Sequence, residues 1–280
     1  MNFYKYHALG NDYLVMQTSG LTRALSEQSI ERICHRHFGI GSDGILLHDG
    51  VNPKGEFLLR IFNPDGSEAE KSGNGLRIYS RFLFDQQLVS SKPFVVSTKG
   101  GLVTSEVRAD GREVTVDMGG VSFESAKIPV TGPAREVLNE TISVLGREFS
   151  YSAATVGNPH CVLLVDKALA DDAKRYGPSL EVEARFPNRT NVQFMEVIDR
   201  NNIRIEIWER GAGYTLASGS SSSASAAIAH RLGLCDRQIT VHMPGGQIAI
   251  TIDSDFQIRM RGAVTRVAEG QLSSEMFEWP

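Results

Sequence analysis

The chain has 280 residues and a formal net charge of -4 at pH 7, with 41% hydrophobic and 22% charged residues. This composition is typical of a globular protein, and the length predicts two domains of about 130–140 residues each. Lys and Arg are scattered, and no apolar run approaches the ~20 residues of a membrane span, which excludes a nucleic-acid-binding surface and a transmembrane protein.

Hydrophobic periodicity predicts a mixed series of helices and strands. In chain order they are a helix around 30–37, a strand at 57–62, a helix at 76–84, strands at 114–118 and 203–207, a helix at 224–232 and a strand at 247–252. Ser26 is the expected N-cap of the first helix. The mixture indicates an α/β protein.

One series of motifs occurs twice. In the first half, the strand at 59–62 is followed by Ser72-Gly73, a helix and a hairpin at Gly100-Gly101. In the second half, the strand at 204–207 is followed by Ser218-Gly219, a helix and a hairpin at Gly245-Gly246. The interval from serine to hairpin is 28 residues in the first series and 27 in the second. The matched order predicts two related halves.

Each Ser-Gly pair stands where a helix begins. The first backbone N–H groups of a helix have no partner within it and carry a partial positive charge, so they suit a carboxylate. Serine is also a common N-cap, which is the structural interpretation of Ser72 or Ser218 alone. Because the pair recurs and related halves usually pack about a pseudo-twofold axis, we expect both serines to line one cleft.

Further polar residues cluster around glycines and strand ends. Asparagine offers both donor and acceptor, so several asparagines with one Glu and one Arg can bind an ammonium and a carboxylate together. The candidates are Asn11, Asn63, Asn158, Asn191, Glu209 and Arg210. The alternative is structural: Asn-Pro sequences are good turns, and Glu209-Arg210 can form a surface ion pair.

The cysteines, Cys34, Cys161 and Cys235, lie outside these motifs. Their odd number and irregular spacing argue against disulfides and zinc and favour buried thiols in a reducing cytoplasm. The N-terminus, Met1–Lys5, lacks the layout of a signal peptide. The glycine motifs lack a P-loop lysine and no His/Cys ligand cluster is present, so we expect neither a metal nor another cofactor.

The chain resembles the diaminopimelate epimerase family nearly from end to end. The motifs that carry the resemblance are Gly10–Asp12, His37–Gly41, Phe62–Glu68, Ser72–Arg77, Gly157–His160, Asn191 and Glu209–Gly213. It implies two pseudo-symmetric α/β (α+β) domains, each a mixed or antiparallel sheet wrapped around a central helix. The expected domains are 1–117 with 263–280, and 118–262.

The resemblance further implies a cofactor-independent epimerase or racemase of amino-acid biosynthesis. Its expected partner is a small-molecule amino acid with a polar distal group, and a homodimer is compatible with the family. By match to the family, Asn11, Asn63, Asn158, Asn191, Glu209 and Arg210 would contact substrate. Gly73, Asn74, Gly219 and Ser220 would hold the reacting carboxylate, and Ser72 and Ser218 stand at the two acid/base positions.

At those two positions the family carries cysteines. A thiol ionises near ~8.5 and an alcohol nearer water's ~16, a difference of roughly 10 kcal/mol, and helix dipoles recover only about 1–2 kcal/mol. Another group would have to activate the hydroxyls, and His7, His160 and Asp65 are the candidates. Three explanations are open: a serine-paired isomerase, a silent relative that binds an amino acid, and an engineered Cys→Ser form that traps substrate.

Overall fold

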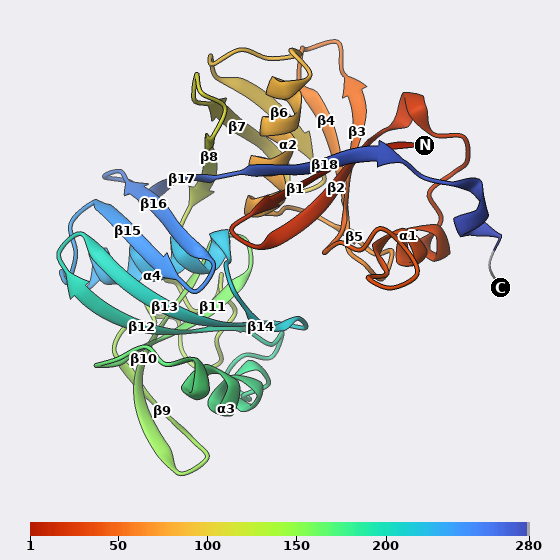
Figure 1. Ribbon diagram of the computed structural model, residues 1–280. Coiled ribbons are helices and arrows are strands. Elements are labelled where there is room, and N and C mark those ends of the chain that lie inside the picture. The colour runs from red at the N-terminus through yellow and green to blue at the C-terminus, as the bar shows by residue number, and fades with distance from the viewer. Residues whose placement is uncertain (279–280) are drawn as a thin grey trace. The chain divides into compact units, whose positions relative to one another are not determined.

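The computed structural model describes residues 1–278. The chain folds into two compact units, Met1–Val116 with Gly262–Pro280 and Asp117–Arg261 (Figure 1). The division expected from the sequence falls at 117/118 and 262/263. Among the described residues, no helix has the length and apolar character to cross a membrane.

The strands of the first unit pair with one another in one sheet. Its elements are β1 (Asn2–Ala8), β2 (Asn11–Gln17), η1 (Thr18–Gly20), α1 (Glu27–Cys34), β3 (Ile45–Val51), β4 (Phe57–Phe62), β5 (Glu68–Ala69), α2 (Gly73–Asp85), β6 (Phe94–Thr98), β7 (Gly101–Val107), β18 (Thr265–Gln271) and η2 (Ser274–Phe277). Two strands, β8 (Glu113–Gly120) and β17 (Gln257–Ala263), run from one unit into the other. The strands pair in the order β18, β1, β2, β3, β4, β6, β7, β8, with β5 also on β4.

The second unit repeats this plan. Its elements are β9 (Glu140–Val144), β10 (Arg147–Thr155), β11 (Pro159–Leu164), α3 (Ala170–Glu181), β12 (Asn191–Asp199), β13 (Asn202–Glu209), β14 (Gly213–Thr215), α4 (Gly219–Arg231), β15 (Gln238–Met243) and β16 (Gly246–Ile252). The strands pair in the order β9, β10, β11, β12, β13, β15, β16, with β14 also on β13.

The predicted internal repeat is confirmed by the direction of these pairings. In the first unit the parallel pairs are β2–β3 and β4–β6, and the other pairs are antiparallel. In the second unit the parallel pairs are β11–β12 and β13–β15. In each unit the first helix, α1 or α3, connects the first parallel pair, and the second helix, α2 or α4, connects the second pair.

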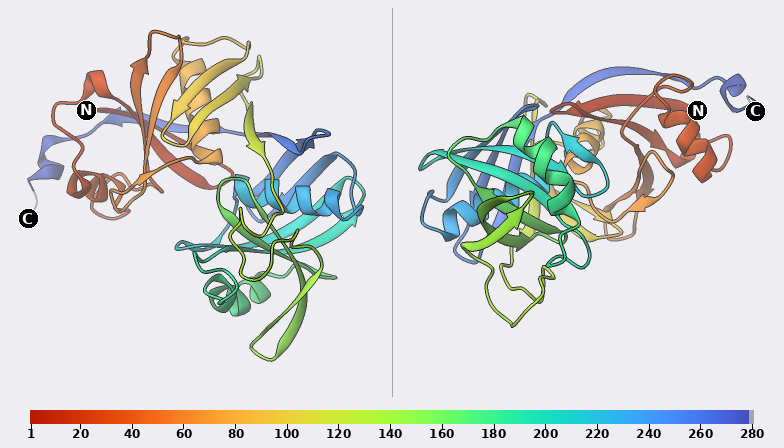
Figure 2. Two further views of the ribbon diagram at one scale, coloured as in Figure 1. Left: turned by 180° about the vertical axis from the view of Figure 1, so that it is seen from behind. Right: turned by 90° about the horizontal axis from the view of Figure 1, so that it is seen from below.

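Helices α2 and α4 are the central helices expected from the sequence. Helix α2 contacts β1, β2 and β7, whereas α4 contacts six strands of its unit, and each lies against strands of its own unit in both views of Figure 2. Large buried side chains of α2, such as Tyr79 and Phe82, fill the first core. Helix α4 instead buries Ser and Ala from Ser221 to Ala229. The predicted sheet wrapped around a central helix is therefore confirmed.

The helix boundaries differ from the sequence-based expectations. The first helix ends at Cys34 rather than near His37, because His35 takes an extended conformation and the Ile33 carbonyl accepts bonds from Ile40 and Gly41. Helices α2 and α4 begin at Gly73 and Gly219, as the Ser-Gly pairs predicted, and thus before the segments 76–84 and 224–232 that hydrophobic periodicity marked. Their first turns are polar or small, so hydrophobic periodicity did not reveal them.

Candidate functional site

Ser72 and Ser218 adopt the same local geometry at the starts of α2 and α4. Ser72 has φ -140° and ψ 119°, and its Oγ accepts a hydrogen bond of 3.0 Å from the Gly75 N–H. Ser218 has φ -146° and ψ 125°, and its Oγ accepts a bond of 3.4 Å from the Ser221 N–H. Both serines are N-caps, so their structural role is present whatever chemistry they perform.

A capping serine retains its own hydroxyl proton. The amide that donates to each Oγ stabilises negative charge on that oxygen, and the partial charge of the helix N-terminus acts in the same direction. Ser72 is half-buried and Ser218 is buried. Among the described residues of its own unit, neither hydroxyl is hydrogen-bonded to a carboxylate or an imidazole.

The three groups considered as activators have other partners. His7 Nδ1 accepts a bond from the Gly10 N–H, and Asp65 accepts from the Ser67 hydroxyl and N–H. The Ser67 hydroxyl and N–H lower the pKa of Asp65. His160 Nε2 lies 3.0 Å from Asn158 Oδ1. Among the described residues, none of these three groups is hydrogen-bonded to the capping serine of its own unit.

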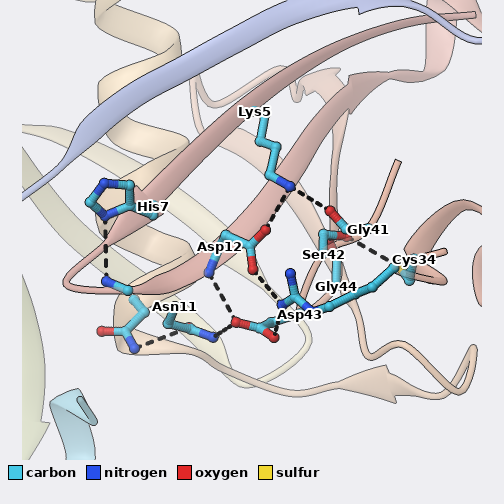
Figure 3. Close-up of polar contacts among 12 residues, drawn as sticks. Lys5, His7, Asn11, Asp12, Cys34, Gly41, Ser42, Asp43 and Gly44 are labelled. Atoms are coloured by element: carbon cyan, nitrogen blue, oxygen red, sulfur yellow. Dashed lines mark hydrogen bonds and ion pairs between the residues drawn. The ribbon is translucent and has the colours of Figure 1, made fainter. Parts of the chain in front are cut away.

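Asn11 and Asn74 join the start of β2 to the first turn of α2. Asn74 Nδ2 donates to Asn11 Oδ1 at 3.0 Å, and Asn74 Oδ1 accepts from Arg77 Nη2 at 2.7 Å. Asn11 Nδ2 donates to Asp43 Oδ2 at 2.9 Å (Figure 3). The predicted residues Asn11, Gly73 and Asn74 are thus brought together beside Ser72.

Four charged side chains surround the start of β2. Lys5 Nζ lies 2.9 Å from Asp12, and Arg36 Nη2 lies 2.7 Å from Asp12 and 2.6 Å from Asp43. Burial opposes ionisation of Asp12, but hydrogen bonds from Arg36 and Lys5 outweigh it and keep the pKa of Asp12 below its ordinary value. Two carboxylates therefore face two cations, and the cluster is neutral.

The second unit has a related but differently bonded arrangement. Asn158 Nδ2 donates to Ser220 Oγ at 3.4 Å, which brings Asn158 and Ser220 beside Gly219 and Ser218. Burial lowers the pKa of His160 to about 3, the positive charge of Arg210 adds to the shift, and the amide of Gln193 opposes it. The imidazole that contacts Asn158 is therefore neutral at ordinary pH.

Asn191 connects two parts of the second unit. Its Nδ2 donates to the Pro159 carbonyl at 2.9 Å, and its Oδ1 accepts from the Arg210 N–H at 3.0 Å. The Arg210 guanidinium donates to the Asn188 carbonyl. Glu209 ends β13 directly before this turn. Asn191, Glu209 and Arg210 are thus brought together.

The hydrogen bonds described for Asn63 lie within its own turn and do not reach Asn11 or Asn74. Its Nδ2 donates to Ser67 Oγ at 3.0 Å and its N–H donates to the Ser67 carbonyl, so Asn63 closes its own turn. This is the structural alternative that the Asn-Pro sequence indicated.

Sequence patterns did not reveal three residues that hold these groups in place. Asp43 accepts from Asn11, and Arg77, although fully buried, donates to Asn74. Glu181 accepts from Trp208 Nε1, from the Gly211 N–H and from Arg189, which fixes the turn after Glu209-Arg210. A lone carboxylate at a helix end gives no motif, so only the tertiary contacts identify Glu181.

Within residues 1–278, no three His, Cys, Asp or Glu side chains gather in a way that could hold a metal ion.

Solved structures share this fold at low sequence identity. A predicted epimerase from Pseudomonas aeruginosa superposes with a TM-score of 0.70 at 16% identity, covering 97% of this chain and 98% of that one. A hydroxyproline epimerase from Agrobacterium vitis gives a TM-score of 0.68 at 16% identity, covering 97% and 90% of the two chains.

Sequence comparisons identify the family. The family model described as diaminopimelate epimerase matches residues 3–124 and 152–267. A protein from a Nostoc species named diaminopimelate epimerase 2 is 60% identical over 277 residues, 99% of this chain and 97% of that protein. Diaminopimelate epimerase from Stutzerimonas stutzeri is 38% identical over 274 residues, 97% and 99% of the two chains. The chain therefore belongs to the diaminopimelate epimerase family.

Proposed function

We propose that the protein is a cofactor-independent isomerase that inverts an α-carbon of diaminopimelate. Ser72 and Ser218 stand at the two proton-transfer positions, one supplied by each unit. The observation that carries the proposal is the duplication of one capped helix start in the two halves of a chain that is 60% identical to a protein named diaminopimelate epimerase 2.

The helix starts supply the electrostatic part of the reaction. Removing an α-proton places negative charge on the carboxylate, as in an enediolate. Backbone N–H groups at Gly73 and Asn74, and at Gly219 and Ser220, are suited to bind that charge where it develops. One serine, ionised to its alkoxide, takes the α-proton from one face and becomes a hydroxyl. The other serine gives its hydroxyl proton to the opposite face and becomes the alkoxide.

The main chemical barrier is that a serine hydroxyl is a very weak acid, so its alkoxide is costly to form. The hydrogen bond that each Oγ accepts from a backbone N–H lowers the cost of the alkoxide. It does not remove the difference of roughly seven in pKa between an alcohol and a thiol. We therefore expect slow turnover.

The second amino-acid end of diaminopimelate distinguishes it from simple aliphatic amino acids. Asn63, Asn191, Glu209 and Arg210 offer amide, carboxylate and guanidinium groups, which match an ammonium and a carboxylate. We propose that these four residues bind the distal end.

Exchange in deuterated water tests the function. The purified protein is incubated with diaminopimelate, and α-deuterium and stereochemistry are followed by mass spectrometry and chiral chromatography. Deuterium with scrambled stereochemistry supports a two-base isomerase, and Ser72→Ala and Ser218→Ala should each abolish it. Ser90→Ala, which alters an exposed serine, is the matched control. Binding by calorimetry without exchange would instead identify a silent relative.

We also infer a cytoplasmic location. Cys34, Cys161 and Cys235 are buried free thiols, as expected in a reducing compartment. Fractionation of cells that express the tagged protein would test this inference.

A further inference from the structure

We propose that Asp43 is a positioning residue that fixes the orientation of the Asn11 and Asn74 side chains beside Ser72. The inference deepens the proposed function, on which it rests. It assigns to Asp43 the task of deciding which side-chain atom of Asn11 faces a substrate carboxylate.

A chain of hydrogen bonds carries the proposal. Asn11 Nδ2 donates to Asp43 Oδ2 at 2.9 Å, and Asn74 Nδ2 donates to Asn11 Oδ1 at 3.0 Å. Arg77 Nη2 donates to Asn74 Oδ1 at 2.7 Å. Figure 3 shows Asp43 and Asn11 joined at the carboxylate end of this chain.

The two ends of the chain force the direction of every bond in it. A carboxylate only accepts and a guanidinium only donates. Asn11 must therefore present its NH₂ to Asp43, and Asn74 must present its carbonyl oxygen to Arg77. The central bond then has one direction that satisfies both ends.

Asp43 is itself held firmly. Its Oδ2 also accepts from the Asp12 N–H at 3.0 Å, and its Oδ1 accepts from Arg36 Nη2 at 2.6 Å. Asn11 Nδ2, the Asp12 N–H and Arg36 thus converge on one carboxylate. Because Lys5 and Arg36 balance Asp12 and Asp43, this anchor adds no net negative charge near a site for an anion.

The fixed direction has a functional consequence. The side-chain nitrogen of Asn11 carries a second N–H besides the one that it donates to Asp43. With the direction set by Asp43, the nitrogen of the half-buried Asn11 stays a donor at a defined place, which suits a carboxylate ligand. A flipped Asn11 would turn its carbonyl oxygen toward Asp43 and place two acceptors against each other.

Three substitutions separate the position of the acceptor from its charge. Asp43→Asn keeps an oxygen that can accept from Asn11 and from the Asp12 N–H, while Arg36 keeps its ion pair with Asp12. Asp43→Glu keeps the charge but moves it by one methylene, and Asp43→Ala removes the acceptor. Asp12→Asn is the control, because it removes a neighbouring charge and leaves the Asn11 bond intact.

We expect Asp43→Ala and Asp43→Glu to lower kcat/KM for α-proton exchange by about 10- to 100-fold, and Asp43→Asn and Asp12→Asn by less than about threefold. In an Asn11→Ala background, Asp43→Ala should add almost nothing, since Asp43 acts through Asn11. Additive losses in that double variant, or equal losses in Asp43→Asn and Asp43→Ala, would overturn the proposal.

A measurement independent of activity separates this inference from the proposed function. Side-chain NH₂ resonances of Asn11 and Asn74, assigned by substitution, should be dispersed and protected from exchange in the wild type and in Asp43→Asn. They should become averaged in Asp43→Ala and Asp43→Glu. If the wild type shows no α-exchange, the proposed function fails, and unchanged amide resonances in Asp43→Glu would still refute the role of Asp43.

Discussion

The starts of α2 and α4 share one backbone plan but orient their polar side chains by different means. In the first unit, Asn74 on the helix donates to Asn11 on the strand, and charged groups end the chain on both sides. In the second unit the direction is reversed, since Asn158, directly before β11, donates to Ser220 on the helix. Its other contact is a neutral imidazole. A duplicated fold therefore preserves the caps while the surrounding amides diverge.

The same divergence appears one turn deeper. Gly75 and Ser221 are the residues whose N–H groups reach the two capping oxygens. A Cβ at Gly75 would lie 3.0 Å from Leu46 Cδ2. In the second unit, Gln193 occupies the sheet position of Leu46 and donates to Ser221 Oγ at 3.0 Å. An apolar contact in one unit is a buried hydrogen bond in the other.

The largest expected effect tests whether the shared caps are the proton-transfer positions. The double variant Ser72→Cys/Ser218→Cys should raise the rate of α-proton exchange by about 10³-fold. The pKa of a thiol is roughly seven below that of an alcohol, and about half of that difference should appear in the logarithm of the rate. Each single substitution should give less. Ser90→Cys adds a thiol at an exposed position and is the control. An unchanged rate in a folded double variant would remove these positions from the mechanism.

A double-mutant cycle sharpens the comparison of the inner turns. Ser221→Ala leaves the buried Gln193 amide without its acceptor and should cost about 1–3 kcal/mol in the free energy of unfolding. Gln193→Leu/Ser221→Ala approaches the apolar arrangement of Leu46 and Gly75 and should recover most of that loss. Urea unfolding measures all four proteins. Additive losses would show that the two side chains do not depend on one another.

Acid should destabilise the protein through the buried imidazole of His160 in the second unit. The folded pKa of His160 is about 3, below its ordinary 6.5, so the unfolded chain binds a proton there between these values and the folded chain does not. The contribution of His160 to the free energy of unfolding is therefore fully present above about pH 6.5. It is lost as the pH falls, by about 2 kcal/mol at pH 5. His160→Gln should remove this part of the acid sensitivity. Equal losses between pH 7 and pH 5 in both proteins would contradict the expectation.

The smallest effect concerns two hairpin turns with the same sequence. Leu145-Gly146 joins β9 to β10 and Leu9-Gly10 joins β1 to β2. Leu145 has φ 48° and Leu9 has φ 55°, a conformation that costs a leucine about 1 kcal/mol and suits asparagine. Leu145→Asn should stabilise the protein by about 0.5–1 kcal/mol in thermal unfolding.

Leu9→Asn makes the same change two residues before Asn11. It should give a similar gain in stability, because the strain is a property of the turn. A loss of stability in Leu145→Asn would show that its exposed side chain, 60% accessible, contributes more than its backbone strain costs.

Short sequence motifs predicted much of the architecture. The Ser-Gly pairs predicted both central helices, and the spacing to the glycine hairpins predicted the repeat, because capping and turn chemistry act over a few residues. The motifs also indicated the family. The catalytic roles of Ser72 and Ser218 stay predictions.

The sequence by itself determined the two halves, their helix starts and their family, since these depend on neighbours along the chain. Only the tertiary structure decided which polar groups meet. The β2–β3 pairing places Asp43 against Asn11, 32 residues away, and Asn63 closes its own turn. The physical reason is that a buried donor takes the acceptor its surroundings supply, and strands distant in sequence supply most of them.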